Sequence, residues 1–112
     1  MFSLFIYMTA AHFLCDYPLQ GEWMSKAKNP NSKLVKDDEI WPHVLIGHAL
    51  IHATAVQLIT GSWILFFLEL CIHTVTDYAK CMGVIGYSTD QRIHILCKLF
   101  YFTLLVFLGW LP

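Results

Sequence analysis

The chain has 112 residues, of which 57% are hydrophobic and 13% are charged, and its mean hydropathy is +0.56. This length suits one domain, and the composition excludes an ordinary water-soluble protein and indicates an integral membrane protein. The formal net charge is −1 and no basic surface pattern is present, which excludes nucleic acid as a partner. The four cysteines have no CxxC spacing, which excludes a zinc ribbon and a disulfide framework.

Four hydrophobic segments follow one another along the chain, at about 2–20, 42–60, 63–82 and 89–111. Each is near the ~20 residues that a helix needs to cross the hydrocarbon core of a bilayer. The long polar stretch at about 21–41 is predicted to be a loop. The sequence "TGS" predicts a tight turn before the third segment, and "GVIGYST" separates the third from the fourth. The predicted fold is all-α: residues 1–112 form a single integral membrane domain, a four-helix transmembrane bundle.

The basic residues lie on one side of this predicted bundle. They are Lys26, Lys28, Lys33 and Lys36 in the polar stretch, and Lys80, Arg92 and Lys98 at the end of the third segment and the beginning of the fourth. The positive-inside rule therefore places the 21–41 loop in the cytoplasm and both termini outside. The predicted location is the bacterial inner membrane.

Each hydrophobic segment also carries one pair of ionisable residues at positions i and i+4. The pairs are His12 and Asp16 in "HFLCD", His48 and His52 in "HALIH", His73 and Asp77 in "HTVTD", and Asp90 and His94 in "DQRIH". This spacing puts both side chains of a pair on one face of a helix. At ~1.5 Å rise per residue, all eight groups fall in the cytoplasmic half of the bundle, with Asp90 at its mouth.

These eight side chains are candidate metal ligands. One HxxxD pair could be a polar clip between neighbouring helices, but four such pairs, one per helix, favour a shared site. Ionised groups that are buried without partners are costly, and imidazole and carboxylate are common ligands of zinc, manganese and iron. Eight donors exceed one tetrahedral site, so we expect two divalent ions, with zinc preferred and manganese or iron as alternatives.

Polar neighbours of these pairs are candidates for other roles. Glu69 lies one turn before His73, where it could orient that imidazole, accept a proton, or only bond a neighbouring helix. Glu69 and Asp90 are the predicted catalytic residues. Gln20 and Gln91 could contact a substrate or cap a helix end. Lys98 could meet an anionic group or snorkel toward the membrane surface.

The four motifs together resemble the signature segments of a known family. "HFLCDYPLQ", "HVLIGHALIH", "HTVTDYAK" and "DQRIH" are similar, in this order, to segments of small bacterial and phage integral membrane proteins of unknown function. The resemblance covers most of the chain from His12 to about His94. More distantly, the placement of His and Asp is similar to that in membrane-bound metal-dependent hydrolases. The "KNPNSKLVKDDE" stretch carries no recognisable motif.

The predicted function is an intramembrane metal-dependent hydrolase whose dinuclear site acts on a phosphoester or related group of a lipid or isoprenoid substrate. One alternative is a di-iron lipid oxidase or hydroxylase, which the single HxxxH motif disfavours. Another is a metal-stapled protein that acts by binding a host membrane protein. A divalent-metal carrier or sensor is a further alternative, of which the carrier is disfavoured because the outer halves of the segments hold few polar residues. The predicted partners are a membrane lipid or lipid-linked substrate, and a second copy of the chain or a host membrane protein.

Overall fold

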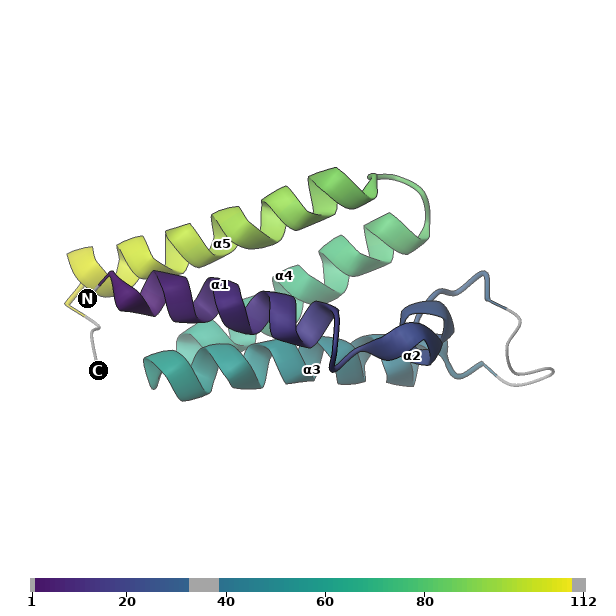
Figure 1. The fold of residues 1–112 in the computed structure, drawn as a ribbon, viewed down its shortest axis with the longest axis horizontal. Helices are drawn as coiled ribbons and strands as arrows, with labels where there is room; N and C mark the ends of the chain where they lie inside the picture. Colours follow the sequence, from purple (N-terminus) through teal and green to yellow (C-terminus); the bar gives the residue numbers. More distant parts are fainter. Residues whose placement is uncertain (1, 33–38, 110–112) are drawn as a thin grey trace.

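The structure, a computed structural model, describes residues 2–32 and 39–109. All regular structure in these ranges is helical: α1 (Ser3–Asp16), α2 (Gly21–Ala27), α3 (Trp41–Thr60), α4 (Trp63–Cys81) and α5 (Tyr87–Phe107). α1 and α4 each pack against both α3 and α5, and α2 packs on α3. The long helices lie side by side in an elongated bundle of 49 × 23 × 21 Å (Figure 1). The predicted all-α class is confirmed for the described residues.

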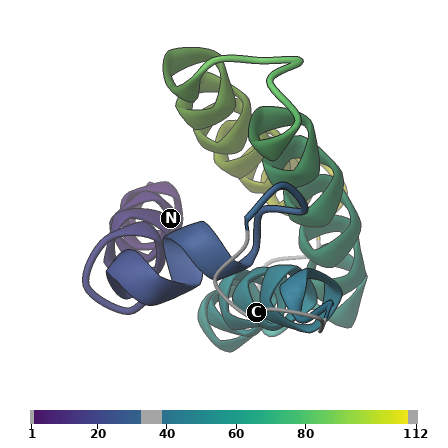
Figure 2. The same ribbon diagram turned by 90° about the vertical axis from the view of Figure 1, so that its right-hand side faces the viewer.

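The bundle has two distinct ends. α1 begins and α5 ends at one of them, where α3 also turns back into α4, and we call this the termini end (Figure 1). The opposite end carries α2 and the connection from α4 to α5, and we call it the α2 end. Seen from the α2 end, α2 lies across the bundle between α1 and α3 (Figure 2).

The first helix and the polar stretch after it differ from the prediction. α1 ends at Asp16 rather than near residue 20, because a proline at position 18 disfavours the helical conformation of Tyr17. Gly21 adopts a positive φ of 68° and begins α2, so the prediction of a loop throughout 21–41 is wrong for Gly21–Ala27. Residues 33–38 of that stretch lie outside the described residues.

The connection between α3 and α4 has the predicted tight turn. Gly61 ends α3 in the left-handed conformation, with φ of 72°, which a residue with a side chain adopts only with strain. The Ser62 hydroxyl accepts a hydrogen bond of 3.2 Å from the backbone N–H of Leu65 and so caps α4. These two residues let α3 and α4 pack antiparallel along their whole lengths.

In the part of the chain that the structure describes, length and hydropathy qualify one helix, α3, to cross a membrane. α1 has 14 residues, which makes it about 21 Å long, whereas the hydrocarbon core is about 30 Å thick. Charged residues lower the hydropathy of the other two long helices. They are Glu69, Asp77 and Lys80 in α4, and Asp90, Arg92 and Lys98 in α5. The expectation of four membrane-spanning helices is therefore not confirmed.

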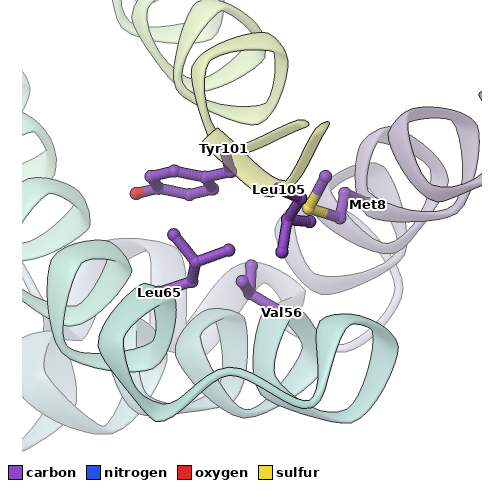
Figure 3. Close-up of a cluster of buried hydrophobic side chains, with 5 residues drawn as sticks. All are labelled: Met8, Val56, Leu65, Tyr101 and Leu105. Carbon is purple, nitrogen blue, oxygen red and sulfur yellow. The ribbon is translucent and has the colours of Figure 1, made fainter. Parts of the chain in front are cut away.

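The interior of the bundle divides into an apolar half and a polar half. Toward the termini end, Met8, Val56, Leu65, Tyr101 and Leu105 form a cluster of buried side chains (Figure 3). Toward the α2 end the buried side chains are mostly polar or charged. Large apolar side chains are instead exposed on the outside of this half, among them Ile46, Val75 and Leu96. The second half of the bundle is thus polar inside and apolar outside.

Candidate metal centre

Five histidines from four helices meet in the polar half. They are His12 from α1, His48 and His52 from α3, His73 from α4 and His94 from α5, and each is at most 1% exposed. The His73 ring lies at the centre, with its centroid 3.8 Å from that of His52 and 4.2 Å from that of His94. The i, i+4 spacing explains why both histidines of α3 face the same interior.

These histidines and Asp16 form two groups in which one donor atom per residue lies within 4.8 Å of every other. The first group contains Asp16, His48, His52 and His73, and the second contains His12, His73 and His94. His73 belongs to both groups. The two groups therefore adjoin, and six of the eight ligands predicted from sequence lie in one or both of them.

Asp16 is the carboxylate of the first group. Its Oδ1 lies 2.9 Å from Nε2 of His52 and 3.2 Å from Nε2 of His48. Its Oδ2 accepts a 2.8 Å hydrogen bond from Nε2 of Gln91 and lies 3.3 Å from Nε2 of His12. Within residues 2–32 and 39–109, no lysine or arginine forms an ion pair with Asp16.

Several ring nitrogens in this cluster have no hydrogen-bond partner among the described residues. They are both ring nitrogens of His48 and of His73, and Nδ1 of His12 and of His94. Carboxylate oxygens do lie 3.2 Å from Nε2 of His48 and 3.3 Å from Nδ1 of His73, but without the alignment of a hydrogen bond. A buried polar atom without a partner is destabilising by about 1–3 kcal/mol. Bound metal would supply a partner for one nitrogen of each imidazole, and a set of imidazoles with one carboxylate suits zinc, manganese or iron.

The balance of buried charge also favours a cation at this position. Four carboxylates lie in the polar half, those of Asp16, Glu69, Asp77 and Asp90, and three ammonium groups accompany them, those of Lys28, Lys80 and Lys98. The last three carboxylates each pair with at least one ammonium group. With the imidazoles neutral, one negative charge remains, and it belongs to Asp16.

Asp77 and Asp90, also predicted as ligands, are not brought into either group. Asp77 pairs with Lys28 at 2.7 Å and with Lys80 at 2.8 Å, and Lys80 also pairs with Asp90 at 3.3 Å. Both carboxylates border the cluster, since Asp77 lies 3.7 Å from Nε2 of His48 and Asp90 lies 3.2 Å from Nε2 of His94. Metal ligation by these two residues, and catalysis by Asp90, stay predictions.

Two other contributors to the site were missed or underrated from the sequence. Lys28 follows α2 and is 2% exposed, although it belongs to a stretch that reads as a solvated loop; no signal in the sequence marks it. Gln91 bridges the cluster, because its amide donates to Asp16 and Asp90 and its Oε1 lies 3.1 Å from Nε2 of His12. Its position next to Asp90 in the sequence was the one indication that Gln91 belongs to the site.

Gln20 acts mainly at a helix end. Its amide donates a 2.9 Å hydrogen bond to the backbone carbonyl of Asp16, and its Oε1 accepts from Lys28. Of the two roles that the sequence left open for Gln20, the described contacts are therefore those of a cap, and they also tie Lys28 to the end of α1.

Glu69 lies on the side of the cluster that faces the apolar half. Its Oε1 is 2.6 Å from Nζ of Lys98 and 3.3 Å from Nδ1 of His73. Its Oε2 accepts a 2.9 Å hydrogen bond from the Tyr101 hydroxyl. Lys98 is 1% exposed, so of the two alternatives left open by the sequence it meets an anionic group rather than snorkelling to a surface.

The cluster is enclosed. Three open grooves of about 320–370 Å³ lie on the described surface, and apolar residues of α1, α3 and α4 line most of them; no histidine of the cluster lines any of the three. Asp16 is the most exposed member of the cluster at 7%, and Gln91, which bonds to it, is 9% exposed. Both lie toward the α2 end, where Lys80 is also partly exposed, so this end is the least enclosed side of the site.

Fold and site together define an all-helical bundle with a buried histidine and aspartate cluster of metal-ligand composition. Residues 4–109 match the family described as "Protein of unknown function (DUF3307)", and the chain belongs to this family. No curated protein and no solved structure matches the chain. The expected membership in a family of unknown function is thus confirmed, whereas the more distant likeness to membrane-bound hydrolases stays a prediction.

Proposed function

We propose that this protein is an integral membrane metal-dependent hydrolase, in which Asp16 and the five clustered histidines bind two divalent ions and act on a phosphoester group of a lipid or isoprenoid. The observation that carries the proposal is the set of buried ring nitrogens without hydrogen bonds around Asp16, the one buried carboxylate among the described residues that no lysine or arginine pairs with.

The distribution of apolar surface supports placement in a membrane. Soluble monomers rarely expose large contiguous apolar patches, whereas Phe67, Val75 and Leu96 are all more than half exposed on the long helices α4 and α5. Polar groups in membrane helices usually face the interior of the bundle, as the histidine cluster does. In this orientation the α2 end, which carries the lysines, faces the cytoplasm.

The charge balance favours an anionic substrate. Two divalent ions would bring four positive charges to an interior that holds one uncompensated negative charge, that of Asp16. Three positive charges would then remain. A hydroxide and a doubly charged phosphate group would neutralise them, which suits phosphoester hydrolysis better than hydrolysis of a neutral ester.

The roles of the chain's own residues follow from the geometry. The imidazoles and Asp16 would hold the ions, and the ions would activate a water molecule and stabilise developing charge on a phosphoryl oxygen. The Gln91 amide, which donates to Asp16 and Asp90, is placed to orient these carboxylates at the approach to the site. Lys80 bridges Asp77 and Asp90 and is the partly exposed cation that an incoming phosphate would meet.

Release of inorganic phosphate tests this function. Purified protein in detergent, loaded with zinc, manganese or iron, is incubated with a panel of lipid and isoprenoid phosphates. We expect metal-dependent phosphate release by the wild type and none by a His48→Ala, His52→Ala double variant. His43→Ala is the matched control, because His43 is exposed at the start of α3 and lies outside the cluster.

Two other outcomes distinguish the alternative functions. Bound metal without phosphate release from any member of the panel contradicts the phosphoester proposal and favours a metal-stapled interaction protein. Bound iron together with an oxygen-dependent change in a lipid contradicts the hydrolase and favours a di-iron oxidase.

A further inference from the structure

Beneath the histidine cluster, Glu69, Lys98 and Tyr101 form a buried triad that needs an explanation of its own. Each of the three is at most 1% exposed. Burying an ion pair is often no more favourable than burying two apolar side chains of similar volume. Stability alone therefore does not explain why the triad is present, because an apolar pair would contribute about as much. Its position beside the histidine cluster suggests a second role.

The triad borders the apolar cluster on one side and contacts the histidine cluster on the other. Tyr101 belongs to the apolar cluster with Leu65 and Leu105, and its hydroxyl points away from Met8 and Leu105 (Figure 3). Beyond Tyr101 the interior is apolar, so the triad does not continue as a polar path toward the termini end. Its one contact with the cluster is Glu69 Oε1 to His73 Nδ1, at 3.3 Å.

A contact with His73 can influence both groups of donor atoms, because His73 is the one residue that the two groups share. An imidazole that donates Nδ1–H to a carboxylate keeps its Nε2 free as a metal ligand, and this partner also fixes the orientation of the ring. The carboxylate must itself be held in place. Glu69 is held by Lys98 at 2.6 Å on Oε1 and by Tyr101 at 2.9 Å on Oε2.

We propose that Lys98 and Tyr101 are positioning residues that act through Glu69 to present Nε2 of His73 to one of the metal ions. This role rests on the proposed metal site. Lys98 compensates the carboxylate charge of Glu69, and Tyr101 fixes its second oxygen. Removing such an outer partner of a metal ligand typically lowers metal affinity 10–100-fold.

The test compares zinc affinities, measured by competition with a chromophoric chelator. Glu69→Leu, Lys98→Met replaces the ion pair by apolar side chains of similar volume, which preserves packing and leaves no buried charge. We expect this double variant to bind zinc 10–100-fold more weakly than the wild type. Glu69→Gln, Lys98→Met is expected to recover part of the affinity, because the glutamine carbonyl oxygen can still accept from Nδ1–H of His73. Tyr101→Phe is expected to have a smaller effect in the same direction.

Leu105→Ala controls for loss of stability, because it lies in the apolar cluster away from Glu69 and should leave zinc affinity unchanged. If Glu69→Leu, Lys98→Met folds and binds zinc as tightly as the wild type, the triad is only a clip between α4 and α5 and the proposal is wrong. If the wild type itself binds no zinc, manganese or iron, the proposed function fails first, and the positioning role fails with it.

Discussion

The two halves of the bundle interior are built from the same four long helices, but one half is apolar and the other is polar. Near the termini end, Leu65 and Leu105 are fully buried in an apolar cluster that needs no partner beyond close packing. Near the α2 end, equally buried positions hold His48 and His73, whose ring nitrogens make no hydrogen bond among the described residues, and a buried polar atom without a partner is costly. Packing is sufficient to explain the first half, and a bound metal is our proposal for the second.

This contrast also separates the proposed site from the rest of the bundle. The apolar half has few polar groups with which to recognise a substrate, whereas the polar half has donors, a charge imbalance at Asp16 and an approach past Gln91. Variants in the apolar half should therefore change stability without changing metal content. Variants in the polar half should lose metal, and should lose stability by the amount that metal binding contributes.

Truncation in the apolar half should have the largest effect on stability. Leu65→Ala and Leu105→Ala each leave a cavity at a position that is 0% exposed, so the free energy of unfolding should fall by about 2–5 kcal/mol. Thermal unfolding in detergent measures the loss, and elemental analysis should show the same metal content as the wild type. A loss of metal from either folded variant would contradict the separation of the two halves.

Metal removal should have the next largest effect, and it should act through the polar half. With free zinc at 1,000 times its dissociation constant, binding to the folded state alone contributes about 4 kcal/mol. A chelator should therefore lower the melting temperature of the wild type and leave that of His48→Ala, His52→Ala unchanged. Equal sensitivity of both proteins to the chelator would show that these histidines are not ligands.

A lysine on the outer face of the bundle tests the membrane placement. Leu96 is 62% exposed in the middle of α5, and Leu96→Lys should disfavour insertion by about 3 kcal/mol. Val84→Lys is the matched control, because Val84 is 75% exposed in the connection between α4 and α5, where a lysine is harmless. Resistance of membrane-bound protein to alkaline extraction should fall for Leu96→Lys alone. Identical behaviour of the two variants would argue for water at both positions.

The cap of α4 should have the smallest effect. Ser62→Ala removes the acceptor for the backbone N–H of Leu65 and should lower the free energy of unfolding by about 1 kcal/mol. Zinc affinity should not change, because Ser62 lies at the termini end. A change in zinc affinity larger than the experimental error would mean that the two halves are coupled through α4.

The parts of the site that local periodicity controls were predictable from the sequence. His48 and His52 lie on one face of their helix because a helix repeats every 3.6 residues. The same spacing in the other segments indicated the faces that meet them, including that of Asp16. Lys28 was not predictable, since its ion pair with Asp77 joins residues far apart in the chain and depends on α2 folding back over the bundle. The sequence therefore shows no partner for Asp77, and metal ligation by this residue stays a prediction.

The number of membrane-spanning helices was less predictable than the fold class, and for a physical reason. The helical pattern predicts α1, α3, α4 and α5, but the buried charges that build the site also lower the hydropathy of α4 and α5. Pro18 further shortens α1. Hydropathy along the chain does not distinguish a polar side chain that faces the interior from one that faces outward, and only the arrangement of the helices makes that distinction.

Elemental analysis of the purified wild type beside the His48→Ala, His52→Ala double variant tests metal binding by the histidine cluster most directly. We expect about two divalent ions per chain in the wild type and a clear loss of metal from the double variant, with His43→Ala unchanged. A folded wild type without stoichiometric metal, or a double variant that keeps its full content, would contradict this expectation.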